Sequence, residues 1–126
     1  MLSQKNDNVF VIIPVFNEKK EVLVQTIREL QKASYSIIVV NDASANDISL
    51  PGIGITYSLR HEVNLGQGAA LQTGIEFALQ KKATYLVTFD ADGQHSSADI
   101  PALLLPIQNN EADITLASRF LKPGHH

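Results

Sequence analysis

Apolar runs that alternate with helix-like segments constrain the fold of this chain most strongly. Residues 9–13 and 36–40 are continuous apolar runs rich in β-branched side chains, typical of strands buried on both faces of a sheet, and Pro14 is expected to end the first. Between them, residues 18–33 repeat apolar side chains at intervals of four and three, which indicates a helix with one buried face. Strands separated by helices form right-handed crossovers and a largely parallel sheet.

The rest of the chain continues this alternation. We predict further strands at residues 54–61, 85–89 and 113–118 and a helix at residues 69–81. The inner face of that helix should consist of Ala70, Leu71, Gly74, Ile75, Phe77 and Ala78. A last helix should begin after Ser97 and be kinked or ended by Pro106. The predicted fold class is α/β, with three αβα layers around a mostly parallel sheet.

Composition excludes several classes of protein. A chain of 126 residues forms one domain, and a net charge of −3 argues against nucleic acid as a partner, because nucleic-acid binders usually have a basic face. The absence of cysteine excludes disulfides and thiolate metal sites, and fits a reducing compartment. The amino terminus is too polar for a signal peptide, and no apolar run could span a bilayer. Residues 125–126 are expected to be a tag remnant.

Two aspartates directly follow the strand predicted at residues 85–89. Asp90 and Asp92 are one residue apart, and Gly93 follows them. Carboxylates this close repel each other, so a bound cation explains the pair. A ligand set of oxygens alone favours Mg²⁺ or Mn²⁺, which would hold phosphate oxygens. The alternative is an Asx turn whose aspartates cap the next helix, and taken alone this stretch leaves both interpretations open.

Polar residues follow four of the five predicted strands. Residues 14–18, 41–47 and 90–95 come after three strands of the expected parallel sheet, and Arg119 follows a fourth. Because the carboxyl ends of parallel strands meet at one edge, these segments predict a binding cleft there. The glycine-rich residues 66–71 lack the third glycine of a dinucleotide fingerprint, and the chain contains no P-loop.

Five motifs occur in an order that resembles one known family. They are residues 11–18 (VIIPVFNE), 39–47 (VVNDASAND), 64–74 (NLGQGAALQTG), 90–95 (DADGQH) and 118–120 (SRF). Together they resemble the glycosyltransferases of family 2, and are most similar to dolichyl- and polyprenyl-phosphate mannose or glucose synthases. The resemblance implies a GT-A, Rossmann-like fold and an inverting transfer of a sugar from a UDP- or GDP-linked donor, in lipid-linked sugar or cell-envelope biosynthesis.

The resemblance implies a metal site at the Asp-x-Asp motif. In that family the two carboxylates hold Mg²⁺ or Mn²⁺ against the donor diphosphate, so Asp90 and Asp92 are the predicted catalytic residues. Gln94 matches a further residue near the metal in the polyprenyl-phosphate branch. The predicted metal ligands are therefore Asp90, Asp92 and Gln94.

The resemblance also implies a set of residues that line the nucleotide sugar. They are Pro14, Phe16, Glu18, Asp42, Asp90, Ala91 and Arg119. Glu18 would contact the ribose, Asp42 would accept a hydrogen bond from the base, and Arg119 would bind the phosphates. The alternatives are that Glu18 only favours a helix N-terminus by its charge and that Asp42 only caps a loop.

The chain departs from the family pattern in two ways. Asn41 and Ala43 stand where the family usually has aspartate and glycine. Family domains also continue well past the Ser-Arg-Phe motif with acceptor contacts and, in many members, the general base. We therefore expect residues 1–124 to be an incomplete domain, truncated on its carboxyl side. The open edge of a cut sheet favours homo-oligomers.

Three functions fit these observations to different degrees. The leading hypothesis is a glycosyltransferase domain with a polyprenyl phosphate as acceptor, cytoplasmic and peripheral at the inner face of the membrane. The alternative is a non-catalytic fragment that binds a nucleotide or a partner chain. A sugar nucleotidyltransferase shares the fold, but it needs a glycine-rich loop after the first strand, where residues 14–17 read Pro-Val-Phe-Asn.

Overall fold

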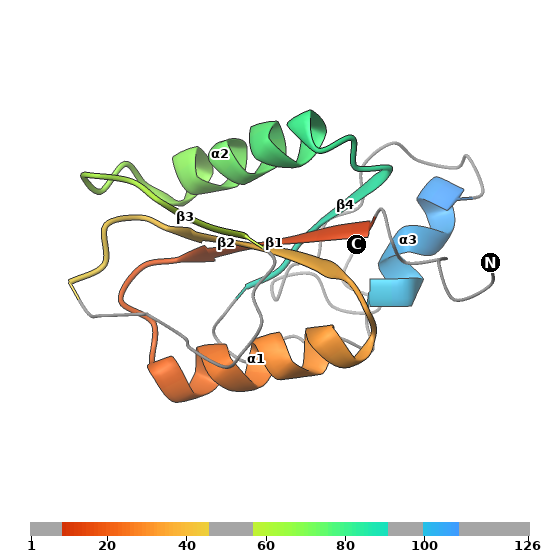
Figure 1. Ribbon diagram of the computed structural model, residues 1–126, viewed down its shortest axis with the longest axis horizontal. Helices are drawn as coiled ribbons and strands as arrows, with labels where there is room; N and C mark the ends of the chain where they lie inside the picture. The colour runs from red at the N-terminus through yellow and green to blue at the C-terminus, as the bar shows by residue number, and fades with distance from the viewer. Residues whose placement is uncertain (1–8, 46–56, 91–99, 109–126) are drawn as a thin grey trace, which may run out of the picture.

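The computed structural model describes residues 9–45, 57–90 and 100–108, and the chain forms strands and helices in alternation (Figure 1). In chain order they are β1 (Val9–Val15), α1 (Lys20–Lys32), β2 (Ser36–Asn41), β3 (Tyr57–Arg60), α2 (Gln67–Gln80), β4 (Tyr85–Thr88) and α3 (Ile100–Gln108). The predicted segments in these ranges are confirmed, with ends shifted by a few residues. The strand predicted at residues 113–118 and the cap at Ser97 lie outside the described residues.

The four strands form one parallel sheet with the order β3-β2-β1-β4. In β1, Ile12 lies opposite Ile38 of β2 on one side and Thr88 of β4 on the other. α1 covers one face of the sheet and α2 covers the opposite face (Figure 1). This confirms the predicted α/β class with three layers. After β1, the chain adds β2 and β3 on one side of it and then adds β4 on the other side, so the strand order reverses at β1.

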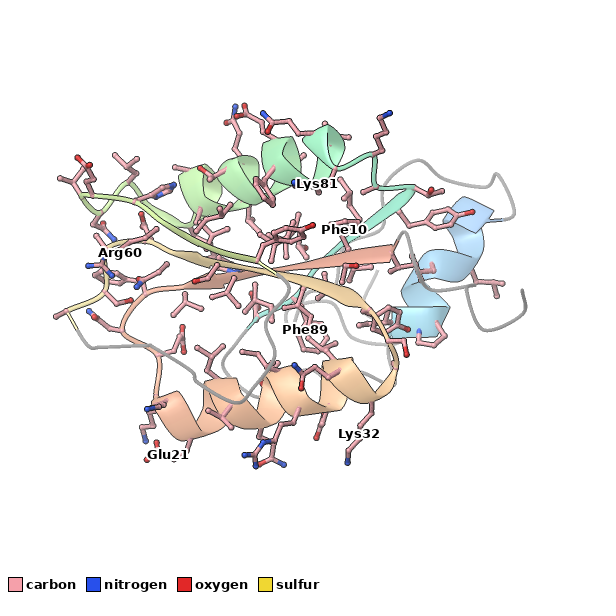
Figure 2. The ribbon with its side chains drawn as sticks, viewed as in Figure 1. Phe10, Glu21, Lys32, Arg60, Lys81 and Phe89 are labelled. Carbon is pink, nitrogen blue, oxygen red and sulfur yellow. The ribbon has the colours of Figure 1, made fainter. Side chains whose placement is uncertain are left out.

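Side chains that alternate along β1 and β2 divide the core into two clusters, one on each face. On the α1 side the cluster includes Val11, Ile13, Leu23, Ile27, Leu30, Ile37, Val39, Phe89, Ile100 and Leu104. On the α2 side it includes Phe10, Ile12, Ile38, Val40, Ala70 and Ala78, with Leu71, Ile75 and Phe77 partly buried against them. Figure 2 shows Phe10 and Phe89 on these opposite sides of the sheet. The predicted inner faces of α1 and α2 are confirmed.

The prediction that Pro14 ends the first strand is wrong, because β1 continues through Pro14 to Val15. α3 ends at Gln108, two residues after Pro106, and a kink at Pro106 stays a prediction. Ile12 accepts a hydrogen bond from Phe89 N–H on the β4 side, so the nitrogen of Pro14, two residues later, is directed to the same side. Since β4 has ended there, the missing N–H of Pro14 breaks no ladder. Pro106 interrupts only the last turn of its helix.

Gly74 allows α2 to pack close to the sheet. A Cβ atom at this position would lie 2.5 Å from Cγ2 of Ile12 and 3.3 Å from Cγ2 of Val40, and both side chains are fully buried. Gly68, earlier in the same helix, has open space at the corresponding point. The two glycines therefore differ in whether a side chain can be added.

We predict that Gly74→Ala lowers the free energy of unfolding by about 1–2 kcal/mol, because overpacking outweighs the better helix propensity of alanine. Gly68→Ala is the matched control and should leave stability unchanged or raise it by up to about 1 kcal/mol. Urea unfolding followed by circular dichroism measures both variants. Equal stabilities of the two variants would contradict the close contact at Gly74.

Candidate functional site

The sheet opens at its carboxyl edge between β1 and β4. β1 pairs with β2 as far as Val15, opposite Asn41, but with β4 only as far as Ile12. Pro14 has no N–H with which to extend the ladder toward β4. Because the strand order reverses at this point, the opening is the topological switch point at which α/β sheets bind ligands. Asp90 lies just beyond the end of β4 at this opening.

The loops that follow β1 and β2 are joined by hydrogen bonds. The backbone N–H of Asn17 donates to Oγ of Ser44 at 2.9 Å, and the N–H of Ala45 donates to Oδ1 of Asn17 at 2.9 Å. Asn17 adopts the left-handed conformation, with φ at +58°, which asparagine tolerates better than most residues. This contact holds Phe16, which is 46 % exposed, and the partly buried Glu18 beside the end of β2.

A tight turn follows β2 on the same edge. Oδ1 of Asn41 accepts a hydrogen bond from the N–H of Ser44 at 2.8 Å, and both residues are buried. Between them Ala43 has φ at +62°, a conformation that costs an L residue with a Cβ about 1–2 kcal/mol. Arg60 Nη2, at the end of β3, donates to the carbonyl of Ser44 at 3.3 Å (Figure 2). The turn is thereby tied to β3 as well as to the loop after β1.

Asp42 organises the loop between β3 and α2. Its side chain is 3 % exposed, and four donors surround its two carboxylate oxygens. Oδ1 accepts from Nδ1 of His61 at 2.7 Å and from the N–H of Leu65 at 2.9 Å. Oδ2 accepts from Nδ2 of Asn64 at 2.9 Å and from the N–H of Gly66 at 2.7 Å. One carboxylate therefore fixes residues 61–66.

The second ring nitrogen of His61 extends this network into α2. Nε2 lies 2.8 Å from Oγ1 of Thr73. Since the carboxylate of Asp42 can only accept, Nδ1 of His61 carries a proton. The prediction that Asp42 contacts a base stays a prediction, but the protein itself already occupies both carboxylate oxygens. His61, Asn64 and Thr73 were not among the predicted site residues.

The environment of Asp42 favours its ionised form. Burial by itself would raise the pKa of this carboxyl, but the hydrogen bonds from Leu65, His61 and Gly66 outweigh burial and lower the pKa below its usual value. The bond from His61 also carries an electrostatic attraction that acts in the same direction. Ionised Asp42 is therefore part of the folded structure at neutral pH.

Asp90 lies beside the amino end of α2. Nε2 of Gln67, the first residue of α2, is 3.5 Å from Oδ1 of Asp90. Gly66 precedes the helix with φ at +101°, a conformation that glycine adopts without strain, so it shapes the turn into α2. Three further predicted residues of the motif at residues 90–95, and the predicted arginine of the motif at residues 118–120, lie outside the described residues. They are Ala91, Asp92, Gln94 and Arg119.

The structure thus brings several predicted residues to one edge of the sheet. Pro14, Phe16, Glu18, Asp42 and Asp90 all lie at or after the carboxyl ends of β1, β2 and β4. Within residues 9–45, 57–90 and 100–108, no group of three or more His, Asp or Glu side chains is close enough to hold a metal ion. In the same ranges no helix has both the length and the apolar character needed to cross a bilayer.

This arrangement agrees with the family to which the chain is matched by sequence. Residues 10–125 match the profile of Glycosyl transferase family 2, so the chain belongs to this family. No solved structure matches the chain.

Several curated proteins are similar to the chain over most of its length. An uncharacterised protein of Methanocaldococcus jannaschii is 38% identical over 120 residues, covering 91% of this chain and 48% of that protein. The UDP-N-acetylglucosamine–dolichyl-phosphate N-acetylglucosaminyltransferase of Methanococcus voltae is 31% identical, covering 91% and 53%. The undecaprenyl-phosphate mannosyltransferase of Micrococcus luteus is 31% identical, covering 92% and 50%. The chain spans about half the length of these relatives.

We predict that Ala43→Gly raises the free energy of unfolding by about 0.5–1 kcal/mol, because glycine removes the cost of a Cβ at positive φ. Ala33→Gly is the control, since Ala33 has φ at −92° and gains nothing from glycine; this variant should lower stability. Urea unfolding compares the two. A loss of stability in both variants would contradict strain at Ala43.

We predict that Asp42→Asn lowers the free energy of unfolding at pH 7 by about 2–3 kcal/mol, because an amide NH₂ would face donors that the carboxylate now satisfies. Since the folded-state pKa of Asp42 lies below its unfolded value, its contribution is complete above about pH 5 and is lost as pH falls through the folded-state pKa. The stability difference between wild type and Asp42→Asn should therefore shrink below pH 4.

Urea unfolding at pH 7, 5, 4 and 3 measures this dependence. Glu62→Gln, in the same loop but exposed, is the control for removing a carboxylate and should have little effect. A difference between wild type and Asp42→Asn that stays constant over this range would show that the charge of Asp42 does not stabilise the loop.

Proposed function

We propose that the chain is the donor-binding part of a glycosyltransferase, which takes a sugar from a UDP- or GDP-linked donor. The observation that carries this proposal is the opening between β1 and β4 in a chain of this family, with Asp90 at its border. A diphosphate placed at this opening would lie at the carboxyl ends of the strands, as ligands of α/β sheets do.

The loops after β1 and β2 supply the nucleoside side of this proposed site. Pro14, Phe16 and Glu18 lie on one side of the opening, and Phe16 has enough exposed ring to pack against a ribose or a base. Hydrogen bonds between Asn17 and residues 44–45 hold these side chains in place before a ligand arrives. Asp42 serves the site by fixing residues 61–66 and the start of α2.

A divalent cation belongs to this proposal. Asp90, together with Asp92 and Gln94, would hold Mg²⁺ or Mn²⁺ through oxygen ligands, which hard cations prefer. When bound, such an ion stabilises the negative charge of the departing diphosphate. The carboxylate of Asp90 suits this role because it lies just after the carboxyl end of β4, beside the first residue of α2. Arg119 would add a planar set of donors for the phosphates.

The acceptor proposed for the reaction is a polyprenyl phosphate. Two of the relatives described above are named for transfer to dolichyl phosphate or undecaprenyl phosphate. Such an acceptor lies in a membrane, so we propose that the protein acts peripherally at the cytoplasmic face. This chain spans about half the length of these relatives. We propose that the general base and the contacts to the acceptor are supplied by a region that corresponds to the other half.

A thermal-shift titration tests the donor site. We expect UDP or GDP with Mn²⁺ to raise Tm by several degrees, since a ligand at about 100 times its Kd adds roughly 2.7 kcal/mol of stability. EDTA and Asp90→Asn should each remove most of the shift. Glu76→Gln, on the exposed face of α2, is the charge-matched control and should keep it.

Each result has a distinct meaning. A shift that persists in EDTA and in Asp90→Asn would contradict the metal site but retain nucleotide binding. No shift with either nucleotide would contradict the donor site. Transfer of labelled sugar to a polyprenyl phosphate then separates a transferase from a fragment that only binds a nucleotide.

A further inference from the structure

The outer face of α1 carries two charged side chains that have no ion-pair partner in the described part of the chain. The helix buries Leu23, Ile27 and Leu30 against the sheet, and Glu21 and Arg28 lie exposed on the opposite face, where they line a groove. Figure 2 shows Glu21 on the side of α1 that faces away from the sheet. Among the described residues neither side chain makes an ion pair. Both are therefore available to a second molecule.

The spacing of these two side chains prevents them from pairing with each other. Seven residues are close to two turns of an α-helix, so Glu21 and Arg28 point in nearly the same direction but lie about 10 Å apart along the axis. Side chains pair along a helix at intervals of three or four residues. At those intervals α1 offers both of them the uncharged Val24 and Gln25, and it offers Arg28 the like charge of Lys32. Neither finds an opposite charge within the helix.

A second copy of the same helix supplies both partners at once. The midpoint between Glu21 and Arg28 falls between Val24 and Gln25, and a two-fold axis at this point makes the second helix antiparallel to the first. Each Glu21 then lies opposite the partner's Arg28, and the half-buried Val24 lies opposite its own equivalent. A parallel copy would instead place like charges opposite each other. The charge pattern is therefore complementary to itself in the antiparallel orientation.

We propose that the outer face of α1 is a surface for weak self-association, across which α1 of a second copy packs antiparallel with an ion pair between Glu21 and Arg28 on either side of Val24. This inference is independent of the proposed function, because the face includes none of the residues placed at the donor site. A helix of 13 residues is about 20 Å long, and its face covers less area than a stable dimer buries. We therefore expect a Kd of about 0.1–1 mM.

Sedimentation equilibrium of the chain at concentrations from about 0.02 to 1 mM tests the proposal. The average mass of the wild type should rise with concentration, and it should rise less in about 0.5 M NaCl, which screens ion pairs. Glu21→Arg and Arg28→Glu should each weaken association by about tenfold or more, because each variant places like charges opposite each other at two symmetric positions. Both side chains are exposed, so the variants should fold as the wild type does.

Mixing the two variants tests the pairing itself. In a dimer of one Glu21→Arg chain and one Arg28→Glu chain, each position 21 faces an opposite charge at position 28. An equimolar mixture should therefore associate about as strongly as the wild type, and so should the double variant. Glu76→Arg makes the same charge change on the exposed face of α2 and is the control, which should leave association unchanged.

Three results would overturn the inference. The first is a wild type that stays monomeric up to about 1 mM. The second is self-association that persists unchanged in both single variants, because it would use another surface, such as an open edge of the sheet. The third is a loss of association in the single variants without recovery on mixing, since Glu21 and Arg28 would then not face each other. None of these results bears on nucleotide binding, which the thermal-shift titration measures separately.

Discussion

Burial of β1 on both faces is the constraint on which the other elements depend. Every side chain from Val9 to Val15 is buried, with alternate residues contacting the α1 side and the α2 side. Each face therefore needs a helix, and each edge of β1 needs a strand, because a backbone in this position has no water to bond. Pro14 is tolerated since it lies beyond the end of β4. The same residue limits how far β1 and β4 can pair, which creates the opening at the site.

Hydrogen bonds, more than apolar contacts, define the edge at which the site lies. The ionised carboxylate of Asp42 accepts four hydrogen bonds and thereby fixes the loop of residues 61–66. Inside the sheet, by contrast, apolar contacts hold the elements together. Asn17 and Ser44 join the two loops on the other side. Polar residues suit this purpose because their bonds set directions as well as distances. The loops are thereby ordered before binding, which lowers the ordering cost of the nucleotide binding proposed above.

The two residues that differ from the family's usual aspartate and glycine, Asn41 and Ala43, lie in one turn. Ala43 keeps a left-handed backbone although it has a Cβ, and the bonds of Ser44 on both sides hold the turn in that form. Asn41 retains the acceptor that Ser44 requires and adds a donor. The alanine at position 43 therefore costs stability, whereas the asparagine at position 41 keeps the hydrogen bond that forms the turn.

The spacing of apolar residues along the sequence determined the α/β class and the buried faces of α1 and α2. It also located the edge of the sheet where polar residues gather. This was possible because burial on one face or on two imposes a characteristic repeat of apolar side chains within each segment. The spacing could not show that Pro14 stays within β1, since that depends on where β4 ends. Nor could it show the partners of Asp42, which lie 19 to 24 positions away along the chain. Such contacts carry no local pattern. They exist only once the sheet has brought the loops together, and so the tertiary structure decided them.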